Sequence, residues 1–373
     1  MAARLVSLDV YRGLAVAGMI LVTNAGNWNA VYWPLSHAAW NGWTPTDLIF
    51  PSFLFIVGVA MTLSFAARIE GGARRGTLGW HVLRRSLVLI VLGLFLNGFP
   101  LFHLATIRIP GILQRIGLCY LFGGLLFLAT YAERAGIRVA MIGGVAVSLL
   151  VGYWALLRFV SVPGYGTNRL DSLGNLGAYF DRALFGIPHL WPYGLTPRHG
   201  VTYDPEGLLS TLPAVATLLL GLLAGELLRS DQSGTRKAIV LLVAGAALIV
   251  AGQLLNPVLP INKRIWTSSF ALFTGGFSLL ALALLYWAVD LRRWRVWATV
   301  PLIFGTNAIF AFALATILSS LLGLIDAPHW FYAQVFSKFL NLYNASLAWA
   351  ILFLLCNAAL IWPLYRKRKF IRI

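Results

Sequence analysis

The sequence predicts an all-α, polytopic membrane protein with about ten transmembrane helices in a single domain over residues 1–373. Hydrophobic residues make up 59% of the chain and charged residues only 11%, whereas a soluble domain has about 25% charged residues. The mean hydropathy is +0.79. Apolar stretches long enough to cross a bilayer also follow one another along the whole chain, which excludes a soluble fold.

Ten stretches of roughly 20 residues each are the predicted spans. They cover residues 5–24, 47–67, 82–100, 112–131, 138–158, 207–228, 237–255, 268–289, 300–322 and 345–365. Asp9 and Arg12 interrupt the first stretch, so we interpret it as a retained helix and not as a cleaved signal peptide. We find no internal repeat and expect no broken helix, the two features that are typical of secondary transporters.

The basic residues set the predicted orientation. The net charge is +17, but the cations recur in small clusters between the spans and form no continuous face, which argues against nucleic acid as a partner. With a cytoplasmic N-terminus, nineteen basic residues lie on the cytoplasmic side and nine on the other. The positive-inside rule therefore places both termini in the cytoplasm, and we expect an integral protein of a bacterial inner membrane.

This orientation gathers polar and aromatic segments on the extracytoplasmic side. They are the loop with His37 and the segments 101–111, 159–206, 256–266 and 324–344. The long 159–206 loop contains Gly, Pro, Tyr, Trp and both signs of charge, so we predict an ordered cap. Within it, Asp204 is predicted to cap the following helix, and Glu206 is a candidate for the outer cavity.

The most informative segment is HAAWNGWTPTDLIFPSFLFIVG at residues 37–58. It places His37, Trp40, Asn41 and Asp47 directly before a charge-free apolar run. A histidine can take a proton at neutral pH, and a carboxamide such as Asn24 can hold a carbonyl or its developing oxyanion. The alternative is structural, with asparagines that form turns and a histidine bonded to the backbone.

Four charged or amide groups inside the spans are candidates for binding. Asp9 and Arg12 lie three residues apart and either pair with each other or bind a ligand. Gln114 and Arg115 begin the fourth span in RIPGILQRIGLCY, where a guanidinium suits phosphate or carboxylate. Pairing of Arg115 with Asp9 or Asp47 is the structural alternative.

Further candidates lie in the C-terminal half. Asn262, Lys263 and Arg264 precede a helix that carries Ser269, and cations before a helix N-terminus favour an anion site. They could equally anchor the chain at the membrane interface, with Trp266 in the aromatic belt. Asn307, an amide inside an apolar span, is expected to bond to a neighbouring helix.

Several kinds of chemistry find no support. Cys119 and Cys356 lie in apolar spans and form no disulfide framework. The histidines lack metal-ligand spacing, so we expect no metal. Walker loops, serine nucleophile elbows and dinucleotide fingerprints are absent from the sequence.

The strings LDVYRGLAVAGMILVTNAG and SHAAWNGWTPTDLIFPSFLFIVGVAM resemble the heparan-α-glucosaminide N-acetyltransferase family, which belongs to the transmembrane acyltransferase superfamily. Further blocks are RIPGILQRIGLCY, DPEGLLSTLPA, NPVLPINKRIWTSSF and FGTNAI, so the resemblance covers essentially the whole chain. It implies transfer of acetyl from cytosolic acetyl-CoA to an amino sugar on the other side of the membrane. It also implies that His37 is catalytic and that Asn24 contributes.

We therefore expect an acetyl-CoA-dependent acyltransferase whose acceptor is an amino sugar or a sugar hydroxyl of a glycan. The catalytic candidates are His37, Asn24 and Asp47. The candidates for acetyl-CoA binding are Arg12, Gln114, Arg115, Lys263 and Arg264. The candidates for acceptor binding are Asp9, Trp40, Asn41, Asn262, Trp266, Ser269 and Asn307. A transporter of a sugar, a lipid-linked sugar or an anion is the rival class, and the oligomeric state, a homodimer among the alternatives, stays open.

Overall fold

The computed structural model describes residues 5–371, and within them the chain divides into two compact units. Unit 1 contains residues 39–42 and 54–283. Unit 2 contains the described residues among 4–38, 43–53 and 284–373. Nearly all regular structure in both units is helical, which confirms the predicted all-α class.

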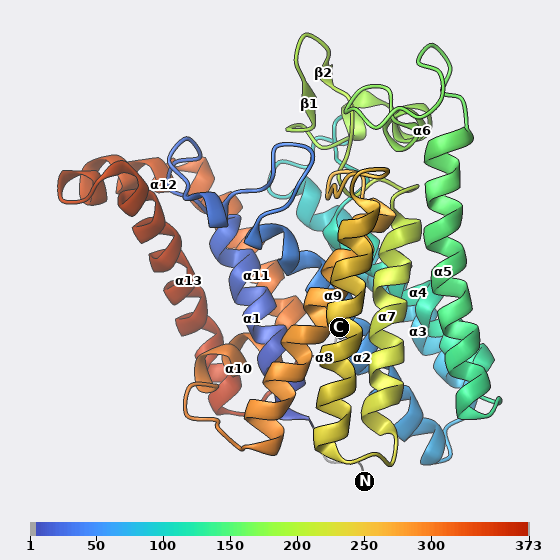
Figure 1. The fold of residues 1–373 in the computed structure, drawn as a ribbon. Helices are drawn as coiled ribbons and strands as arrows, with labels where there is room; N and C mark the ends of the chain where they lie inside the picture. Colours follow the sequence, from blue (N-terminus) through green and yellow to red (C-terminus); the bar gives the residue numbers. More distant parts are fainter. Residues whose placement is uncertain (1–4, 372–373) are drawn as a thin grey trace. The chain divides into compact units, whose positions relative to one another are not determined.

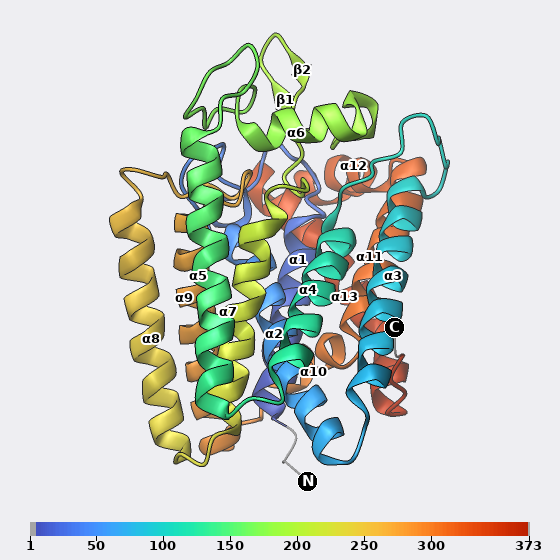
Figure 2. The ribbon, with the colours of Figure 1, turned by 90° about the vertical axis from the view of Figure 1, so that its right-hand side faces the viewer.

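Unit 1 is built from long helices and one small cap (Figures 1 and 2). Its elements are most of α2 (Ile49–Glu70), α3 (Arg75–Gly98), α4 (Ile112–Thr130), α5 (Ala135–Phe159), α6 (Leu176–Phe185), the 3₁₀ turn η3 (Ile187–His189), β1 (Leu195–Thr196), β2 (Gly200–Val201), α7 (Thr211–Arg229), α8 (Gly234–Leu255) and most of α9 (Ser268–Leu285). In the most apolar stretch of α7, 78% of the residues are buried, whereas the share is 22% in α5 and in α8. The helix α7 therefore lies at the centre of this unit.

Close backbone contact between α2 and α7 explains part of this packing. A Cβ added to Gly58 would lie 2.1 Å from the Leu218 carbonyl oxygen, and one added to Gly221 would lie 2.0 Å from the Phe55 carbonyl oxygen. Only glycine allows such an approach. Small residues at helix contacts are typical of membrane proteins, because lipid supplies no hydrophobic force between helices.

The segment between α5 and α7 folds over one end of these helices as the ordered cap that the sequence predicts (Figures 1 and 2). It contains α6, whose Asn175 side chain accepts a hydrogen bond from the Ala178 amide at 2.8 Å. The antiparallel pair β1 and β2 adds a hairpin in which Leu195 pairs with Val201. The indole of Trp40 donates a hydrogen bond to the Leu170 carbonyl oxygen at 2.8 Å, so residues 39–42 are bonded to this cap.

Unit 2 contains the first helix and the C-terminal third of the chain. Its elements are α1 (Val6–Val22), the 3₁₀ turns η1 (Trp33–Leu35) and η2 (Pro45–Leu48), the start of α2, the wide turn η4 (Tyr286–Leu291), α10 (Thr299–Thr306), α11 (Ala308–Leu324), α12 (Ala327–Trp330), the short turns η5 (Phe331–Val335) and η6 (Phe336–Lys338), and α13 (Leu342–Arg366). The helices α1 and α10 pack closely, because a Cβ on Gly305 would lie 1.9 Å from the Asp9 carbonyl oxygen.

The predicted spans correspond to helices, with one important difference. Among the described residues, eight helices are long and apolar enough to cross a membrane, or nine if α10 and α11 form one span. The helix α1, with 17 residues, is at the lower limit of about 17–25 residues. The expectation of unbroken helices is wrong for α10 and α11, which are bent by 86° where they meet.

The bend also corrects the prediction for Asn307, which lies between the two helices and does not bond to a neighbouring helix. Its Nδ2 donates to the Lys369 carbonyl oxygen at 3.1 Å, and its Oδ1 accepts from the Ile371 amide at 2.8 Å. The Asn307 side chain thus satisfies one backbone carbonyl and one backbone amide of the segment that follows α13. Asn307 therefore holds the C-terminal segment against the break.

Candidate active site

The loop between α1 and α2 holds the catalytic candidates of unit 2. Just before α2, Thr44 and Asp47 form a capping box around η2, with Pro45 at the first position of the turn. The Asp47 Oδ2 atom accepts the Thr44 amide at 3.0 Å. This pairing satisfies a backbone donor that would otherwise be orphaned at the start of the helix, and it fixes the Asp47 side chain.

Asp47 also contacts His37, as the sequence suggested by placing them at one helix mouth. The His37 Nδ1 atom lies 2.7 Å from Asp47 Oδ1, and the Ala38 amide donates to Oδ2 at 3.1 Å. The Asp47 side chain is 1% exposed and the His37 side chain 34%. A carboxylate can accept the Nδ1 proton of an imidazole, and in that tautomer Nε2 is the basic nitrogen of the ring.

Two threonine hydroxyls brace this loop from the other side. The Thr44 hydroxyl lies 2.6 Å from the Ser36 carbonyl oxygen and 3.1 Å from Asp47 Oδ2, so its single proton is shared between them. The Thr46 hydroxyl donates to the Pro34 carbonyl oxygen at 2.9 Å. Residues 34–38 and 44–47 are thus one hydrogen-bonded piece, and His37 is positioned by it.

Asn24 is buried near the end of α1 and does not hydrogen-bond to His37. Its Nδ2 donates to the Ile20 carbonyl oxygen at 2.7 Å and to the Thr23 hydroxyl at 3.2 Å. Both amide protons are therefore used within the helix end. Asn24 can donate to an oxyanion only after its side chain turns away from these acceptors.

Asp9 and Arg12 form the ion pair that the sequence allowed, at 3.2 Å along one face of α1. Arg12 also donates to the carbonyl oxygen of Gly305 at 3.3 Å. These contacts tie α1 to α10 and give the pair a structural role in unit 2. On the same helix, the Tyr11 hydroxyl bonds to Ser52 at 2.9 Å.

Unit 1 contains a second polar cluster, where the cap meets the start of α7. Arg108 pairs with both Asp204 and Glu206. Burial opposes its charge, but the two carboxylates raise the pKa of Arg108 above its usual value. Although burial alone would raise it, the cations Arg108, Arg115 and Lys263 lower the pKa of Glu206. Asp204 is therefore an ion-pair residue and not the predicted helix cap, since α7 begins only at Thr211.

Arg115 lies in the core of unit 1 and is 1% exposed. Its Nη2 donates to the Gly207 carbonyl oxygen at 2.9 Å and to the Ser210 hydroxyl, and its guanidinium lies 5.1 Å from the Trp266 ring centroid. Within unit 1, these contacts are the hydrogen bonds and the aromatic contact of Arg115. Among the residues that the structure describes, Nε and Nη1 of Arg115 have no hydrogen-bond partner, which is costly for a buried cation.

The other candidates for acetyl-CoA binding in unit 1 differ in exposure. Arg264 is half-buried and lies 5.3 Å over the Trp191 ring, and its buried Nε has no partner within residues 5–371. Lys263 is half-buried too. Gln114 is buried and donates to the Ile109 carbonyl oxygen at 3.1 Å, so it holds the turn before α4.

Most acceptor candidates in unit 1 are buried in hydrogen-bonded structure. The Asn262 side chain donates to Asn41 Oδ1 at 3.0 Å, and the Gly42 amide donates to the Ile261 carbonyl oxygen at 2.7 Å. The Ser269 hydroxyl is bonded to Thr267 at 3.0 Å, and the Trp266 indole donates to Thr217 at 3.3 Å. This geometry favours structural roles for Asn262, Trp266 and Ser269, while Trp40 is only half-buried.

Three polar residues of these clusters are not among the candidates that the sequence predicts: Thr44, Arg108 and Asp181. Thr44 belongs to a Thr-x-x-Asp pattern directly before an apolar run, which is the sequence signature of a capping box. Arg108 pairs with Asp204, 96 residues away, and Asp181 accepts the Leu208 amide at 2.9 Å, 27 residues away. No local spacing identifies partners so far apart in the chain.

Comparison with known proteins identifies the family. The family model for the catalytic region of heparan-alpha-glucosaminide N-acetyltransferase matches residues 4–254, which include His37, Asp47 and Arg115. The chain is 30% identical over 351 residues to the heparan-alpha-glucosaminide N-acetyltransferase of Homo sapiens, covering 83% of this chain and 52% of that protein. The Mus musculus protein of the same name is also 30% identical, with 83% and 53% covered. The chain thus spans about half the length of these relatives, and it belongs to the heparan-alpha-glucosaminide N-acetyltransferase family.

Proposed function

We propose that this protein is a membrane-embedded acetyltransferase that moves acetyl from cytosolic acetyl-CoA to an amino sugar on the extracytoplasmic side. The observation that carries the proposal is the His37–Asp47 pair, at 2.7 Å, in a chain of this family. We place the protein in a bacterial inner membrane, and the distribution of basic residues supports cytoplasmic termini. An amino group is preferred over a hydroxyl because the relatives are named as N-acetyltransferases.

The proposed chemistry is direct. The amine nitrogen attacks the thioester carbonyl carbon, the new C–N bond forms, and the C–S bond breaks. His37 Nε2 accepts the proton that the nitrogen loses and returns it to the departing CoA sulfur, so atoms and charges balance. Asp47 stabilises the imidazolium that forms in between. A general base of this kind contributes about 10²–10⁴-fold in rate.

A second route uses the same residues in two steps. His37 Nε2 first attacks the thioester carbonyl carbon, the C–S bond breaks, and CoA leaves as a thiolate from an acetyl-imidazolium. The amine nitrogen then attacks the acetyl carbon, the bond from that carbon to Nε2 breaks, and the proton that the nitrogen loses passes to the CoA thiolate. In either route, negative charge develops on the carbonyl oxygen and needs a donor. Asn24 is the proposed donor after its side chain has turned, and the second candidate is a backbone amide of the same loop.

The phosphate and carbonyl oxygens of acetyl-CoA need cationic donors. Arg115 fits this requirement because two of its buried nitrogens, Nε and Nη1, have no partner within the described residues. Arg264 has one such atom and, with Lys263, is more accessible. We propose these three as the donors in unit 1, and Arg12 as a further cation in unit 2.

The test is acetyl transfer from labelled acetyl-CoA to glucosamine by purified protein in lipid nanodiscs. His37→Ala should lower kcat by about 10²–10⁴-fold and change acetyl-CoA affinity little, because the base acts only in the transition state. His199→Ala is the matched control, since His199 is exposed on the β1–β2 hairpin. Quenching without acceptor separates the routes, because only the two-step route leaves label on the protein. Full activity of His37→Ala would show that His37 is neither the base nor the acyl carrier.

One observation favours the rival function. Helices broken inside a membrane, such as α10 and α11 with their 86° bend, are typical of secondary transporters. A transporter would move glucosamine into liposomes without acetyl-CoA and without chemical change. Measuring uptake of labelled glucosamine, and the acetylation state of what enters, decides between the two functions.

A further inference from the structure

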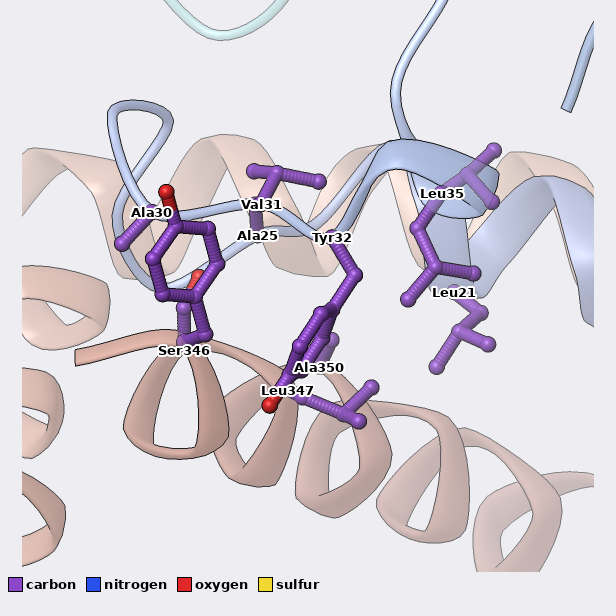
Figure 3. A pocket seen from close by; sticks show the side chains of 11 residues that line it. Leu21, Ala25, Ala30, Val31, Tyr32, Leu35, Ser346, Leu347 and Ala350 are labelled. Carbon is purple, nitrogen blue, oxygen red and sulfur yellow. The ribbon is translucent and has the colours of Figure 1, made fainter. Parts of the chain in front are cut away.

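Figure 3 shows a small hollow in unit 2, between the loop that follows α1 and the start of α13. Val31, Leu35 and Ala350 are among the residues that line it. It has room for about one water molecule, so no part of a substrate fits there. The groups that bear on ligand binding lie in unit 1, in the polar cluster around Arg115.

One peptide group of this cluster is hydrogen-bonded to an ionisable side chain at each end. It joins Gly207 and Leu208, in the turn before α7. The Leu208 amide donates to Asp181 Oδ1 at 2.9 Å, and the Gly207 carbonyl oxygen accepts from Arg115 Nη2 at 2.9 Å. Asp181 belongs to α6 of the cap and Arg115 to α4. A single planar group therefore connects the carboxyl with the guanidinium.

Tight packing keeps this connection in place. Asp181 is 2% exposed, and a Cβ added to Gly207 would lie 1.8 Å from Asp181 Oδ2, so the carboxyl packs directly against the Gly207 Cα atom. The Gly207 carbonyl oxygen also accepts the Ser210 and Thr211 hydroxyls, at 3.0 and 3.1 Å. Hydrogen bonds at the two ends of one peptide polarise each other. A negative charge on Asp181 therefore strengthens the bond between the Gly207 carbonyl oxygen and Arg115.

The carboxyl of Asp181 changes its charge near neutral pH. The ionisable groups within electrostatic reach of it are Arg115 of α4, Tyr153 of α5, Arg182 of α6 itself and Asp204 of the turn. Burial, with the charge of Asp204, raises the pKa of Asp181 to about 7, although the cations Arg115 and Arg182 oppose the rise. Arg182 is bonded to two backbone carbonyl oxygens, so its charge stays in place. The cation whose effect on Asp181 a ligand can offset is therefore Arg115.

Arg115 is also the cation with donors to offer. Within residues 5–371 its buried Nε and Nη1 have no hydrogen-bond partner. An anionic group bound to them would offset the positive charge that now favours ionised Asp181. Ligand binding and ionisation of Asp181 thus oppose each other, and by reciprocity the protonated carboxyl favours the ligand.

We propose that Asp181 is a positioning residue for Arg115: protonated Asp181 leaves Arg115 free to bind acetyl-CoA, whereas ionised Asp181 holds Arg115 against the Gly207 carbonyl oxygen and weakens binding. The inference rests on the proposed role of Arg115 in binding acetyl-CoA, and it adds the regulation of that site. The protein should bind acetyl-CoA with higher affinity below neutral pH than above it.

The test is the Kd for acetyl-CoA of the protein in lipid nanodiscs, measured across neutral pH. Asp181→Asn carries no charge at any pH and still accepts the Leu208 amide. Coupling between two sites is typically about 5–150-fold, so the Kd of the parent divided by that of Asp181→Asn should rise about fivefold or more from about pH 5.5 to about pH 8.5. The ratio cancels the titration of the phosphate of the ligand itself, whose pKa is about 6.

Two further variants separate positioning from a general effect of charge. Asp171→Asn is the matched control, because Asp171 is a cap carboxylate that also accepts two backbone amides, those of Leu173 and Gly174; it should keep the profile of the parent. Arg115→Gln removes the cation and should make the ratio independent of pH. Should Arg115→Gln fail to fold, calorimetry in buffers of different ionisation enthalpy decides. The parent should take up more protons than Asp181→Asn on binding at about pH 7.5, which a purely structural Asp181 would not cause.

The contrary results are distinct. Equal pH profiles and equal proton uptake of the parent and Asp181→Asn refute the regulation and leave acetyl-CoA binding intact. A ratio that still depends on pH without Arg115 shows that Asp181 does not act through Arg115. A control variant that behaves like Asp181→Asn shows that any carboxylate of the cap has this effect. If the parent binds no acetyl-CoA at any pH, the proposed donor itself is wrong, and the regulation with it.

Discussion

Replacing Asp47 by asparagine should nearly abolish acetyl transfer while keeping the fold, for a reason that lies in its hydrogen bonds. The Oδ2 atom of Asp47 accepts hydrogen bonds from the Ala38 and Thr44 amides, which can only donate, so an oxygen must stay at this position in the variant. The Oδ1 position meets His37 Nδ1, and an imidazole nitrogen can either donate or accept. The new NH₂ group therefore turns toward His37, which becomes protonated on Nε2 and loses its basic nitrogen.

The magnitude follows from two separate losses. To regain the active tautomer, the variant must place two donors against each other, at a cost of about 1–3 kcal/mol, which is about 5–150-fold in population. The imidazolium formed during transfer also loses a charge-assisted bond of about 1.5–3 kcal/mol. Together these predict that kcat falls by about 10²–10⁴-fold. KM for acetyl-CoA should change little, because Asp47 is almost wholly buried.

The assay is acetyl transfer to glucosamine at saturating acetyl-CoA, with the thermal midpoint as the measure of folding. Asp290→Asn is the matched control: Asp290 also accepts two backbone amides, those of Val6 and Ser7 at 3.1 and 3.2 Å, but contacts no proposed catalytic group. Its activity should stay within a few-fold of the parent. If Asp47→Asn turns over as fast as the parent, then His37 does not act as a base oriented by Asp47.

Three further predictions concern topology, pH and packing. We expect single cysteines placed at Arg198, on the cap, and at Gln232, between α7 and α8, to react with an impermeant thiol reagent from opposite sides of the membrane. The background lacks the native cysteines. Labelling of both positions from outside would contradict the orientation. Burial raises the pKa of Asp181 to about 7, above its unfolded value. Its contribution to stability is therefore full below about pH 4 and is lost as the pH rises through 7, by about 4 kcal/mol in all. Asp181→Asn should flatten this part of the dependence of the thermal midpoint on pH, and an unchanged profile would show that Asp181 is ionised throughout. Gly305→Ala should lower the free energy of unfolding by about 1–3 kcal/mol through overpacking. Gly323→Ala should not lower it, because Gly323 has open space around it. Equal thermal midpoints of the two variants would refute the close contact of α1 with α10.

The helices could be predicted from the sequence because each span is a local property. A run of apolar residues as long as the bilayer is thick has to become a helix there, since lipid offers no partner for the backbone. The bend at Asn307 could not be predicted in this way. The amide of Asn307 is satisfied by backbone more than sixty residues away, at Lys369 and Ile371, and a local pattern contains no trace of that partner.

The same distinction applies to the two polar clusters. His37 and Asp47 lie within one loop, so their proximity follows from the sequence, and the Thr44-x-x-Asp47 capping box even supplies the orientation. Arg108 and Asp204 are 96 residues apart, and their pairing depends on how the cap folds onto α7. Charge alone could not distinguish Arg108 from the other loop cations.

The capping box has a consequence for how the loop could have acquired its chemistry. An acidic residue three positions after Thr44 is favoured at the start of α2, whatever the protein does. The Oδ2 atom of Asp47 accepts the Thr44 and Ala38 amides, and its Oδ1 atom contacts His37 Nδ1. The residue that caps the turn therefore also orients the His37 ring. Variants of Thr44 therefore test both roles: Thr44→Val should lower the thermal midpoint and kcat together, whereas Thr44→Ser, which keeps the hydroxyl, should restore both. If Thr44→Val lowered the midpoint alone, the cap and the orientation of His37 would be independent.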